Sequence, residues 1–217
     1  MKYKEIYRHY ESKFEAFGPN AKGMDWPDEA DLVRRFEVML RPSVEFSQVY
    51  GVPPRILDLG CGVGLFYDFL QDRREDFADL YRGIDISPLM IDAAKALRPA
   101  ASFQCVDILD HTDFIQSCDV VFMNGVLTEK ISLSQKEMTD FATSLISRAW
   151  ELSEYALCFN VMSKHVDWER EDLFHWSFDE LYQFLKEKIS PHVVIRSDYG
   201  LYEYTAYVYR RSTSKGV

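Results

Sequence analysis

From Arg55 onward, the sequence alternates short apolar runs with longer stretches that carry apolar residues on one helical face. This alternation is typical of βαβ units, in which helices connect parallel strands. The expected strands lie at residues 56–59, 80–84, 102–106, 120–123 and 155–161. The expected helices lie at 65–71, 88–97, 134–150 and from 178 onward, and the last two open with capping boxes at Ser134/Glu137 and Ser177/Glu180. The pattern predicts an α/β fold with a doubly wound, mostly parallel sheet.

The last two apolar runs, at 192–196 and 201–209, are separated only by residues 197–200. Parallel neighbours need a crossover of about a dozen residues or more, so these two strands can pair directly only if they are antiparallel. Along the final run, apolar or aromatic residues occupy both alternating faces, which favours a strand packed on both sides. The sequence therefore predicts an antiparallel last strand.

The N-terminal residues follow a different, purely helical pattern. A first helix is marked by Ile6, Tyr10, Phe14 and Phe17, and a second by Leu32, Phe36, Met39 and Leu40. Residues 17–27 between them contain two glycines and two prolines, which indicates a loop. Because neither helix has a strand of its own to cover, we expect residues 1–50 to form a helical cap with a lid loop. Residues 51–217 are expected to form one globular domain.

A run of glycines follows directly on the first strand, in the sequence ILDLGCGVG at residues 56–64. Glycines permit a tight turn and let backbone N–H groups reach a ligand, and the N-terminus of the next helix adds partial positive charge. This predicts a small ligand on the loop, whereas a glycine-rich turn that binds nothing is the alternative. A dinucleotide loop would carry its third glycine where Leu65 stands, and the Gly-Lys-Ser/Thr ending of a P-loop is absent.

Two acidic residues stand at the expected tips of the second and third strands. Asp85 ends the second run, and a carboxylate there can accept hydrogen bonds from both hydroxyls of a ribose. It could instead cap the next helix, but Ser87 and Pro88 already provide an N-cap and a proline at the first helical position. Asp107 ends the third run, where its carboxylate and the N–H of Ile108 would fit the edge of an adenine.

Composition narrows the class of protein and its partners. The 217 residues are 47% hydrophobic and 28% charged, which is ordinary for a globular protein. The net charge of −10 repels phosphate backbones and disfavours a nucleic-acid partner. Four cysteines without a CxxC pair or zinc-ligand spacing are expected to be reduced thiols. No apolar run has the length of a membrane span and the first residues are too polar for a secretory signal, so we expect a cytoplasmic protein without a membrane partner.

Together, these motifs resemble the class I, seven-strand S-adenosylmethionine-dependent methyltransferases. The resemblance covers residues 55–210 and rests on LDLGCGVG at 57–64, GIDIS at 83–87, VDIL at 106–109, CDVVFMNGVL at 118–127 and the reversed last strand. It implies a seven-strand sheet of order 3-2-1-4-5-7-6 in which the seventh strand is antiparallel. It also implies S-adenosylmethionine as cofactor and S-adenosylhomocysteine as product.

The resemblance further implies a role for each matched position. The glycine loop and Asn124, with Gly125, would lie beside the methionine part, and Cys61 would contribute only its backbone. Asp85 would hold the ribose and Ile86 would pack on the adenine. The expected cofactor-binding residues are Asp58, Gly60, Cys61, Gly62, Gly64, Asp85, Ile86, Asp107, Ile108 and Asn124.

The acceptor side is less specified. Transfer of a sulfonium methyl group is an in-line displacement that needs the acceptor atom held about 3 Å away, and it needs no metal. The family places the acceptor beside the loops after strands four and five and under the N-terminal cap.

His165 is the candidate general base there because an imidazole titrates near neutral pH, although a surface histidine near a turn is the alternative. No third ligand joins His165 and Asp167 at a readable spacing, so no metal is predicted. The other candidate acceptor-side residues are Asn160, Tyr10, Trp26 and Arg35.

Two classes of acceptor are disfavoured because this sequence lacks the motifs that family members and related enzymes acting on those acceptors usually have. Those that methylate exocyclic amines of nucleic-acid bases usually have an Asp/Asn-Pro-Pro-aromatic tetrad, whereas residues 124–127 here are Asn-Gly-Val-Leu. Related aminopropyltransferases usually have a GGGDG-type loop, whereas this loop is GCGVG. We therefore expect methyl transfer to an O or N atom of a small molecule. A non-catalytic S-adenosylmethionine-binding protein or partner subunit and a nicotinamide oxidoreductase are the alternatives, and the sequence assigns no oligomeric state.

Overall fold

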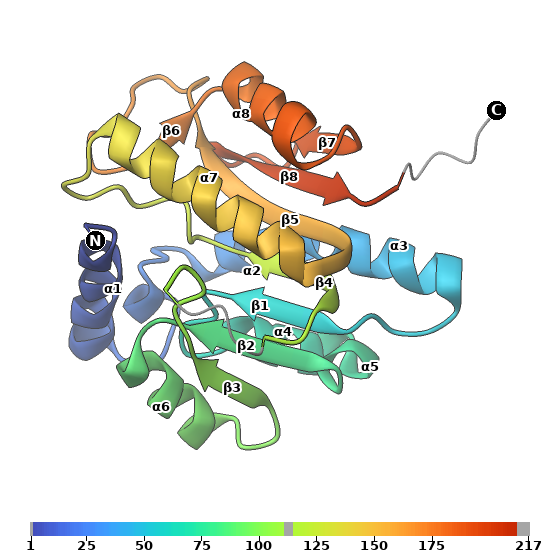
Figure 1. Cartoon of the computed structure of the whole chain (residues 1–217). Helices are drawn as coiled ribbons and strands as arrows, with labels where there is room; N and C mark the ends of the chain where they lie inside the picture. Colours follow the sequence, from blue (N-terminus) through green and yellow to red (C-terminus); the bar gives the residue numbers. More distant parts are fainter. Residues whose placement is uncertain (1, 111–114, 212–217) are drawn as a thin grey trace.

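The computed structural model describes residues 2–110 and 115–211, and a mixed β-sheet forms its centre. The main path of the sheet has the order β3-β2-β1-β4-β5-β8-β7 (Figure 1). All neighbours from β3 to β5 pair in parallel, as the alternating pattern predicted. The strands are β1 (Ile56–Leu59), β2 (Tyr81–Asp85), β3 (Ser102–Cys105), β4 (Cys118–Met123), β5 (Ser153–Ser163), β6 (His175–Trp176), β7 (Val193–Arg196) and β8 (Glu203–Tyr209).

The last strand, β8, lies between β5 and β7 and is antiparallel to both. In Figure 1 the arrow of β8 runs in the direction opposite to the arrows of β1 and β2. Every residue of β8 is buried, which agrees with the expectation of packing on both faces. The predicted antiparallel last strand is confirmed. The two-residue strand β6, which pairs with the end of β5 outside the main path, was not expected from the sequence.

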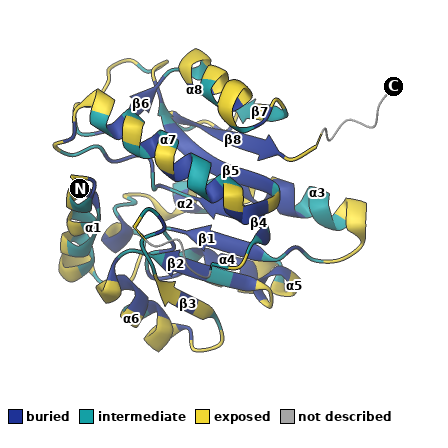
Figure 2. Ribbon diagram, viewed as in Figure 1, coloured by how far each residue is buried: buried dark blue, intermediate teal, exposed yellow. Residues whose placement is uncertain are grey.

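Helices cover both faces of the sheet. Successive strand residues alternate between the two apolar cores: Leu57 and Leu59 contact the core that includes α7 and α8, whereas Ile56 contacts the core formed with α2, α4 and α6. In Figure 2 the central strands β1, β4, β5 and β8 are largely buried, whereas the edge strand β3 and the outer sides of the helices are exposed. The helices are α1 (Lys4–Phe17), α2 (Glu29–Met39), α3 (Arg41–Tyr50), α4 (Leu65–Arg73), α5 (Glu75–Ala78), α6 (Pro88–Leu97), α7 (Gln135–Leu152) and α8 (Phe178–Phe184), with single turns η1 (Lys22–Met24) and η2 (Leu185–Ile189).

The N-terminal residues divide into two parts with different roles. Helix α1 lies beside the ends of β1 and β2 toward which their arrows point, at the left of Figure 1. The predicted second helix is instead interrupted at Leu40, and its two parts, α2 and α3, belong to a layer that covers the sheet. Phe36 packs on Phe66 of α4, and the Tyr207 hydroxyl of β8 donates a hydrogen bond to the Val38 carbonyl. The expectation that this helix has no strand to cover was therefore wrong.

Side-chain caps fix the helix starts that the sequence indicated. Ser134 and Glu137 form the complete capping box at the start of α7. Ser177 accepts the backbone N–H of Glu180 at the start of α8. Each cap satisfies backbone N–H groups that the first helical turn leaves without partners.

The four cysteines are free, and only Cys105 is exposed. Within residues 2–110 and 115–211, no helix combines the length and apolar character that a membrane crossing requires.

Candidate functional site

A pocket opens at the carboxyl ends of the parallel strands. Its walls are the glycine loop after β1, the segments that follow β2 and β3, the loop after β4, and side chains of α1. All of the residues predicted to bind a cofactor line it except Gly64. The lining residues from that prediction are Asp58, Gly60, Cys61, Gly62, Asp85, Ile86, Asp107, Ile108 and Asn124.

Two glycines of the loop serve different purposes. Gly62 has a φ of 53°, and a Cβ there would lie 2.7 Å from the Met24 sulfur, so its lack of a side chain lets the segment around η1 approach the loop. Gly64, with a φ of 91°, is the residue before α4, and a Cβ there would lie 2.8 Å from a ring carbon of Phe103. Gly64 therefore permits close packing against Phe103, and it lies behind the pocket wall.

Asp85 stands at the tip of β2 with both carboxylate oxygens held by the backbone. Oδ2 accepts the Gly62 N–H at 2.9 Å, and Oδ1 accepts the Ser87 N–H at 2.9 Å. Burial raises the pKa of Asp85, and the hydrogen bonds from Ser87 and Gly62 act in the opposite direction. Because each carboxylate oxygen has two lone pairs, the group can still accept hydrogen bonds from a ligand. The N-cap of α6 is Ser87, as predicted.

Asp107 is bound by a residue that the sequence analysis did not select. Its Oδ2 accepts the hydroxyl of Tyr3 at 2.7 Å, and its Oδ1 accepts the Leu109 N–H at 3.1 Å. Tyr3 lines the pocket and stacks on Phe141 with ring centroids 4.9 Å apart. The periodic pattern of α1 could have found Tyr3, which lies three residues before Ile6 on the same helical face.

Asp58 is the most deeply buried of the three strand carboxylates, with only 3% of its surface exposed. Its Oδ2 accepts the hydroxyl of Tyr81 at 2.8 Å. Burial raises the pKa of Asp58 to about 7, although the Tyr81 hydrogen bond acts to lower it. This side chain therefore titrates near neutral pH.

The loop after β4 is closed over by aromatic side chains. A Cβ on Gly125 would lie 2.6 Å from a ring carbon of Trp26, so only glycine fits under that ring. The Tyr10 hydroxyl donates to the Gly125 carbonyl at 3.1 Å. Beside it, the buried Asn124 Oδ1 has no hydrogen-bond partner among the described residues. This oxygen is available to a ligand that can donate a hydrogen bond.

Two predicted acceptor-side residues take part in a buried network behind Trp26. Arg35 Nε lies 3.0 and 2.9 Å from the two carboxylate oxygens of Glu203, and its guanidinium lies 4.3 Å from the centre of the Trp26 ring. Asn160 accepts the Gly125 N–H at 2.8 Å and donates to Glu203 at 3.1 Å. These contacts make Arg35 and Asn160 supports for the loop after β4 and for Trp26.

His165 and Asp167 do not line the pocket. The His165 ring lies 5.1 Å from that of Phe178, and its backbone N–H donates to Ser163.

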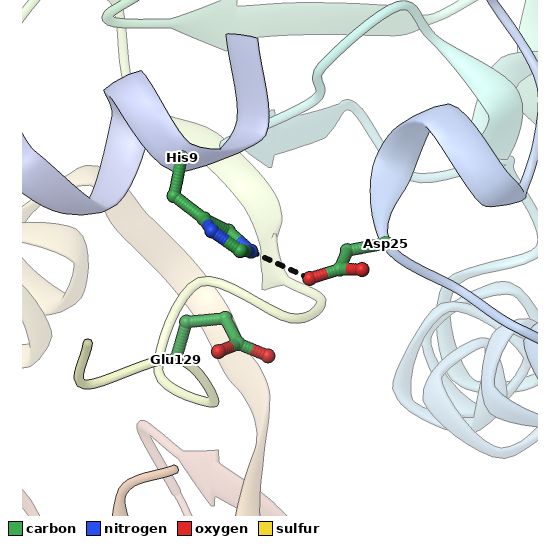
Figure 3. Close-up of side chains that lie close together, drawn as sticks. All are labelled: His9, Asp25 and Glu129. Carbon is green, nitrogen blue, oxygen red and sulfur yellow. Dashed lines mark hydrogen bonds and ion pairs between the residues drawn. The ribbon is translucent and has the colours of Figure 1, made fainter. Parts of the chain in front are cut away.

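A cluster missed from the sequence lies next to the pocket wall, where His9, Asp25 and Glu129 converge (Figure 3). His9 Nε2 lies 2.6 Å from Asp25 Oδ2, and the Lys13 ammonium lies 2.8 Å from Asp25 Oδ1. Burial raises the pKa of Glu129 to about 7, and the charge of Asp25 acts in the same direction. The sequence carries no signal for this cluster, because strands β1 to β4 lie between Asp25 and Glu129 along the chain.

Comparison with known proteins decides the family. A family profile described as a methyltransferase domain matches residues 56–148. Protein Rv1506c of Mycobacterium tuberculosis, which carries the name methyltransferase, is 30% identical over 165 residues, or 74% of this chain and 95% of that protein. The chain belongs to the class I S-adenosylmethionine-dependent methyltransferases. Two structures that share its fold hold S-adenosylmethionine or S-adenosylhomocysteine, the cofactor and the product of this family.

Two further similar proteins have names that state an acceptor. The trans-aconitate 2-methyltransferase of Methylobacterium nodulans is 31% identical over 105 residues, which cover 48% of this chain and 39% of that protein. The crystal structure of magnesium protoporphyrin IX methyltransferase from Synechocystis PCC 6803, with bound S-adenosylmethionine, matches with a TM-score of 0.63 at 18% identity. That match covers 97% of this methyltransferase and 98% of the other chain, so the two share their whole fold.

Proposed function

We propose that this methyltransferase transfers the methyl group of S-adenosylmethionine to an oxygen or nitrogen atom of a small-molecule acceptor. The enclosure of the pocket carries the proposal. Helix α1 and Trp26 cover the loop after β4, and Tyr10 is hydrogen-bonded to that loop. Walls made of the chain's own aromatic side chains favour an acceptor that enters the pocket over the surface of a folded macromolecule.

The same proposal assigns the pocket residues to parts of the cofactor. Asp85 would accept the ribose hydroxyls, since its backbone hydrogen bonds orient both oxygens at the tip of β2. Asp107 and the Ile108 N–H would bind the adenine edge, with Ile86 against the ring. Gly60, Gly62 and Asp58 would lie around the methionine part.

The unpartnered Asn124 Oδ1 supports this assignment at the other end of the pocket. A buried carbonyl oxygen without a hydrogen bond is costly, and the ammonium group of a bound methionine moiety would supply the missing donor. The described residues that line the pocket include carboxylates but no lysine or arginine, which suits a cofactor with a positively charged sulfonium and ammonium group.

The bound cofactor supplies an activated methyl group, so the protein's task is to position the acceptor and exclude water. Trp26, Tyr10 and Phe36 line the pocket with large apolar surfaces that can do both. Two of the similar proteins are named for acceptors of limited size, trans-aconitate and magnesium protoporphyrin IX, which supports a small-molecule acceptor for this chain.

Calorimetric titration with S-adenosylhomocysteine tests the cofactor assignment. We expect Asp85→Ala to weaken binding by ~1.5–3 kcal/mol, because it removes hydrogen bonds to a charged group. The matched control is Asp72→Ala, since Asp72 is exposed on α4 and should leave the dissociation constant unchanged. Equal affinity of the two variants would refute the ribose role of Asp85.

Methyl transfer itself is tested by incubating the protein with S-adenosylmethionine labelled in the methyl group and, in separate reactions, with a pool of metabolites, with unrelated protein or with nucleic acid. The expected result is label in a new small molecule, at a rate that falls in Asp85→Ala. Binding without any transfer would support the alternative of a non-catalytic cofactor-binding protein. Label found only in added protein or nucleic acid would contradict the small-molecule acceptor.

A further inference from the structure

Three potential metal ligands from separate segments converge at one place in the structure (Figure 3). His9 lies on α1, Asp25 follows η1, and Glu129 lies in the loop after β4. One ligand atom from each residue lies within 4.8 Å of the others. We propose that these three side chains bind one divalent transition-metal ion. This inference does not depend on which acceptor the enzyme uses.

Glu129 provides the strongest support. Only 9% of its surface is exposed, and its carboxylate receives no hydrogen bond from another described residue. A buried carboxylate without donors is unfavourable unless a proton or a cation neutralises it, and three potential ligands at one place favour a cation. Its backbone is fixed by a bridge to Leu173, and the N–H groups of Lys130 and Ile131 both donate to the Asp172 carbonyl. The loop therefore holds the Glu129 side chain toward His9 and Asp25.

The other two ligands already lie close to a coordinating arrangement. His9 Nε2 and Asp25 Oδ2 are 2.6 Å apart, whereas two atoms bound to one zinc ion at about 2.0–2.2 Å lie about 3 Å or more from each other. A small separation of this pair would place an ion between them and Glu129. Lys13 occupies the other Asp25 oxygen at 2.8 Å and leaves Oδ2 to the ion.

The donor set selects the class of metal. One imidazole nitrogen with two carboxylate oxygens suits Zn²⁺, Mn²⁺ or Fe²⁺, whereas Mg²⁺ and Ca²⁺ prefer oxygen ligands alone. Three protein ligands leave coordination positions open. The neighbours of the cluster in sequence, Tyr10 and Trp26, line the pocket, so an ion at this place would lie near the acceptor.

The first test is calorimetric titration of the chelator-treated full chain with Zn²⁺ alone. We expect one ion per chain, with binding weakened at least about tenfold by His9→Gln and by Glu129→Gln. Glu15→Gln is the matched control, because Glu15 is exposed on the same helix as His9 and should change affinity less than about twofold. Mg²⁺ should not compete at the same concentration. Affinity equal in Glu129→Gln and Glu15→Gln, or no saturable binding, would overturn the proposal.

A second variant gives an opposite expected sign and does not remove a ligand. Lys13→Met removes a positive charge beside Asp25 that repels a cation bound at Oδ2, so it should tighten Zn²⁺ binding several-fold. If His9, Lys13 and Asp25 formed only a structural ion-pair group, Lys13→Met would leave Zn²⁺ affinity unchanged. The visible absorption of bound Co²⁺ provides an independent measure of nitrogen and oxygen ligation, and a thiolate charge-transfer band would assign the ion to Cys105 instead.

Discussion

At the scale of single residues, the three strand carboxylates of the pocket differ in what balances their charge. Asp85 is bound by two backbone N–H groups and Asp107 by one backbone N–H and the Tyr3 hydroxyl. Asp58 has the Tyr81 hydroxyl as its partner and is almost wholly buried. Since one neutral donor does not replace water around a carboxylate, Asp58 is the carboxylate whose charge opposes folding most.

This imbalance predicts a pH dependence of stability. The pKa of Asp58 rises from 3.8 to about 7 on folding, so between these values the folded chain holds a proton that the unfolded chain releases. The stabilisation present at low pH is therefore lost as pH rises toward 7, by up to about 4 kcal/mol. The Asn side chain of the Asp58→Asn variant has no proton to lose, so this variant should not lose stability in this way. The difference in free energy of unfolding, variant minus wild type, should therefore increase from pH 4.5 to pH 7.5.

Urea denaturation of both proteins across this pH range measures the effect, since other titrating groups cancel in the difference. Asp72→Asn, which changes an exposed aspartate on α4, should give a curve parallel to that of the wild type. If the Asp58→Asn curve is parallel as well, Asp58 is ionised in the folded protein near pH 5 and its raised pKa is wrong.

At the scale of elements, the sequence predicted what local signals determine. The expected strand at 56–59 and helix at 88–97 have the observed bounds, because the glycine loop ends β1 while Ser87 and Pro88 start α6. The division between α2 and α3 was missed although Pro42 marks it, since the apolar spacing continues through Leu40. Strand β6 has two residues, too few for any periodic pattern.

Helix α1 is the element whose stability should depend most on the cofactor. Ile6 is the one buried residue within this helix, whereas α7 has six, so α1 depends largely on polar contacts, which at the pocket are Tyr10 with Gly125 and its N-cap residue Tyr3 with Asp107. Elements with little buried apolar surface open locally, and a ligand that binds only the closed form suppresses the opening.

Hydrogen exchange with and without S-adenosylhomocysteine tests this dependence. Amides of α1 should exchange at least about tenfold more slowly with ligand at 100 times its dissociation constant, whereas the buried half of α7 should change little. Equal protection of both helices would indicate global stabilisation alone. No protection of α1 would contradict its place over the bound cofactor.

At the scale of the whole molecule, the pocket joins the N-terminal residues to segments as far along the chain as Leu145 of α7. The pocket residues at the ends of β1, β2 and β3 could be predicted from the sequence, because each of them lies at or directly after a strand that its own apolar run identifies. It did not predict the cluster of His9, Asp25 and Glu129, since only the packing of α1 against the loop after β4 brings these residues together. The contact of Arg35 with Glu203, 168 positions apart, has the same origin and links α2 to β8.

Removing the Arg35 side chain should weaken the whole fold. The side chains of Arg35 and Glu203 are 13% and 1% exposed, so Arg35→Met leaves a buried carboxylate with only the Asn160 amide and the Tyr199 hydroxyl as donors. Loss of one partner of a buried pair typically costs about 3–5 kcal/mol. Because the two remaining donors still stabilise the Glu203 carboxylate, we expect a loss at the lower end of this range, near 3 kcal/mol.

Arg34→Met is the matched control, because Arg34 pairs with Asp31 at the surface and should change stability by less than about 1 kcal/mol. Replacing both Arg35 and Glu203, as Arg35→Met with Glu203→Gln, should recover part of the loss in urea denaturation, since no buried charge is then left unpaired. If the double variant is less stable than Arg35→Met by the full effect of Glu203→Gln alone, the two side chains act independently and the link between α2 and β8 has no energetic role.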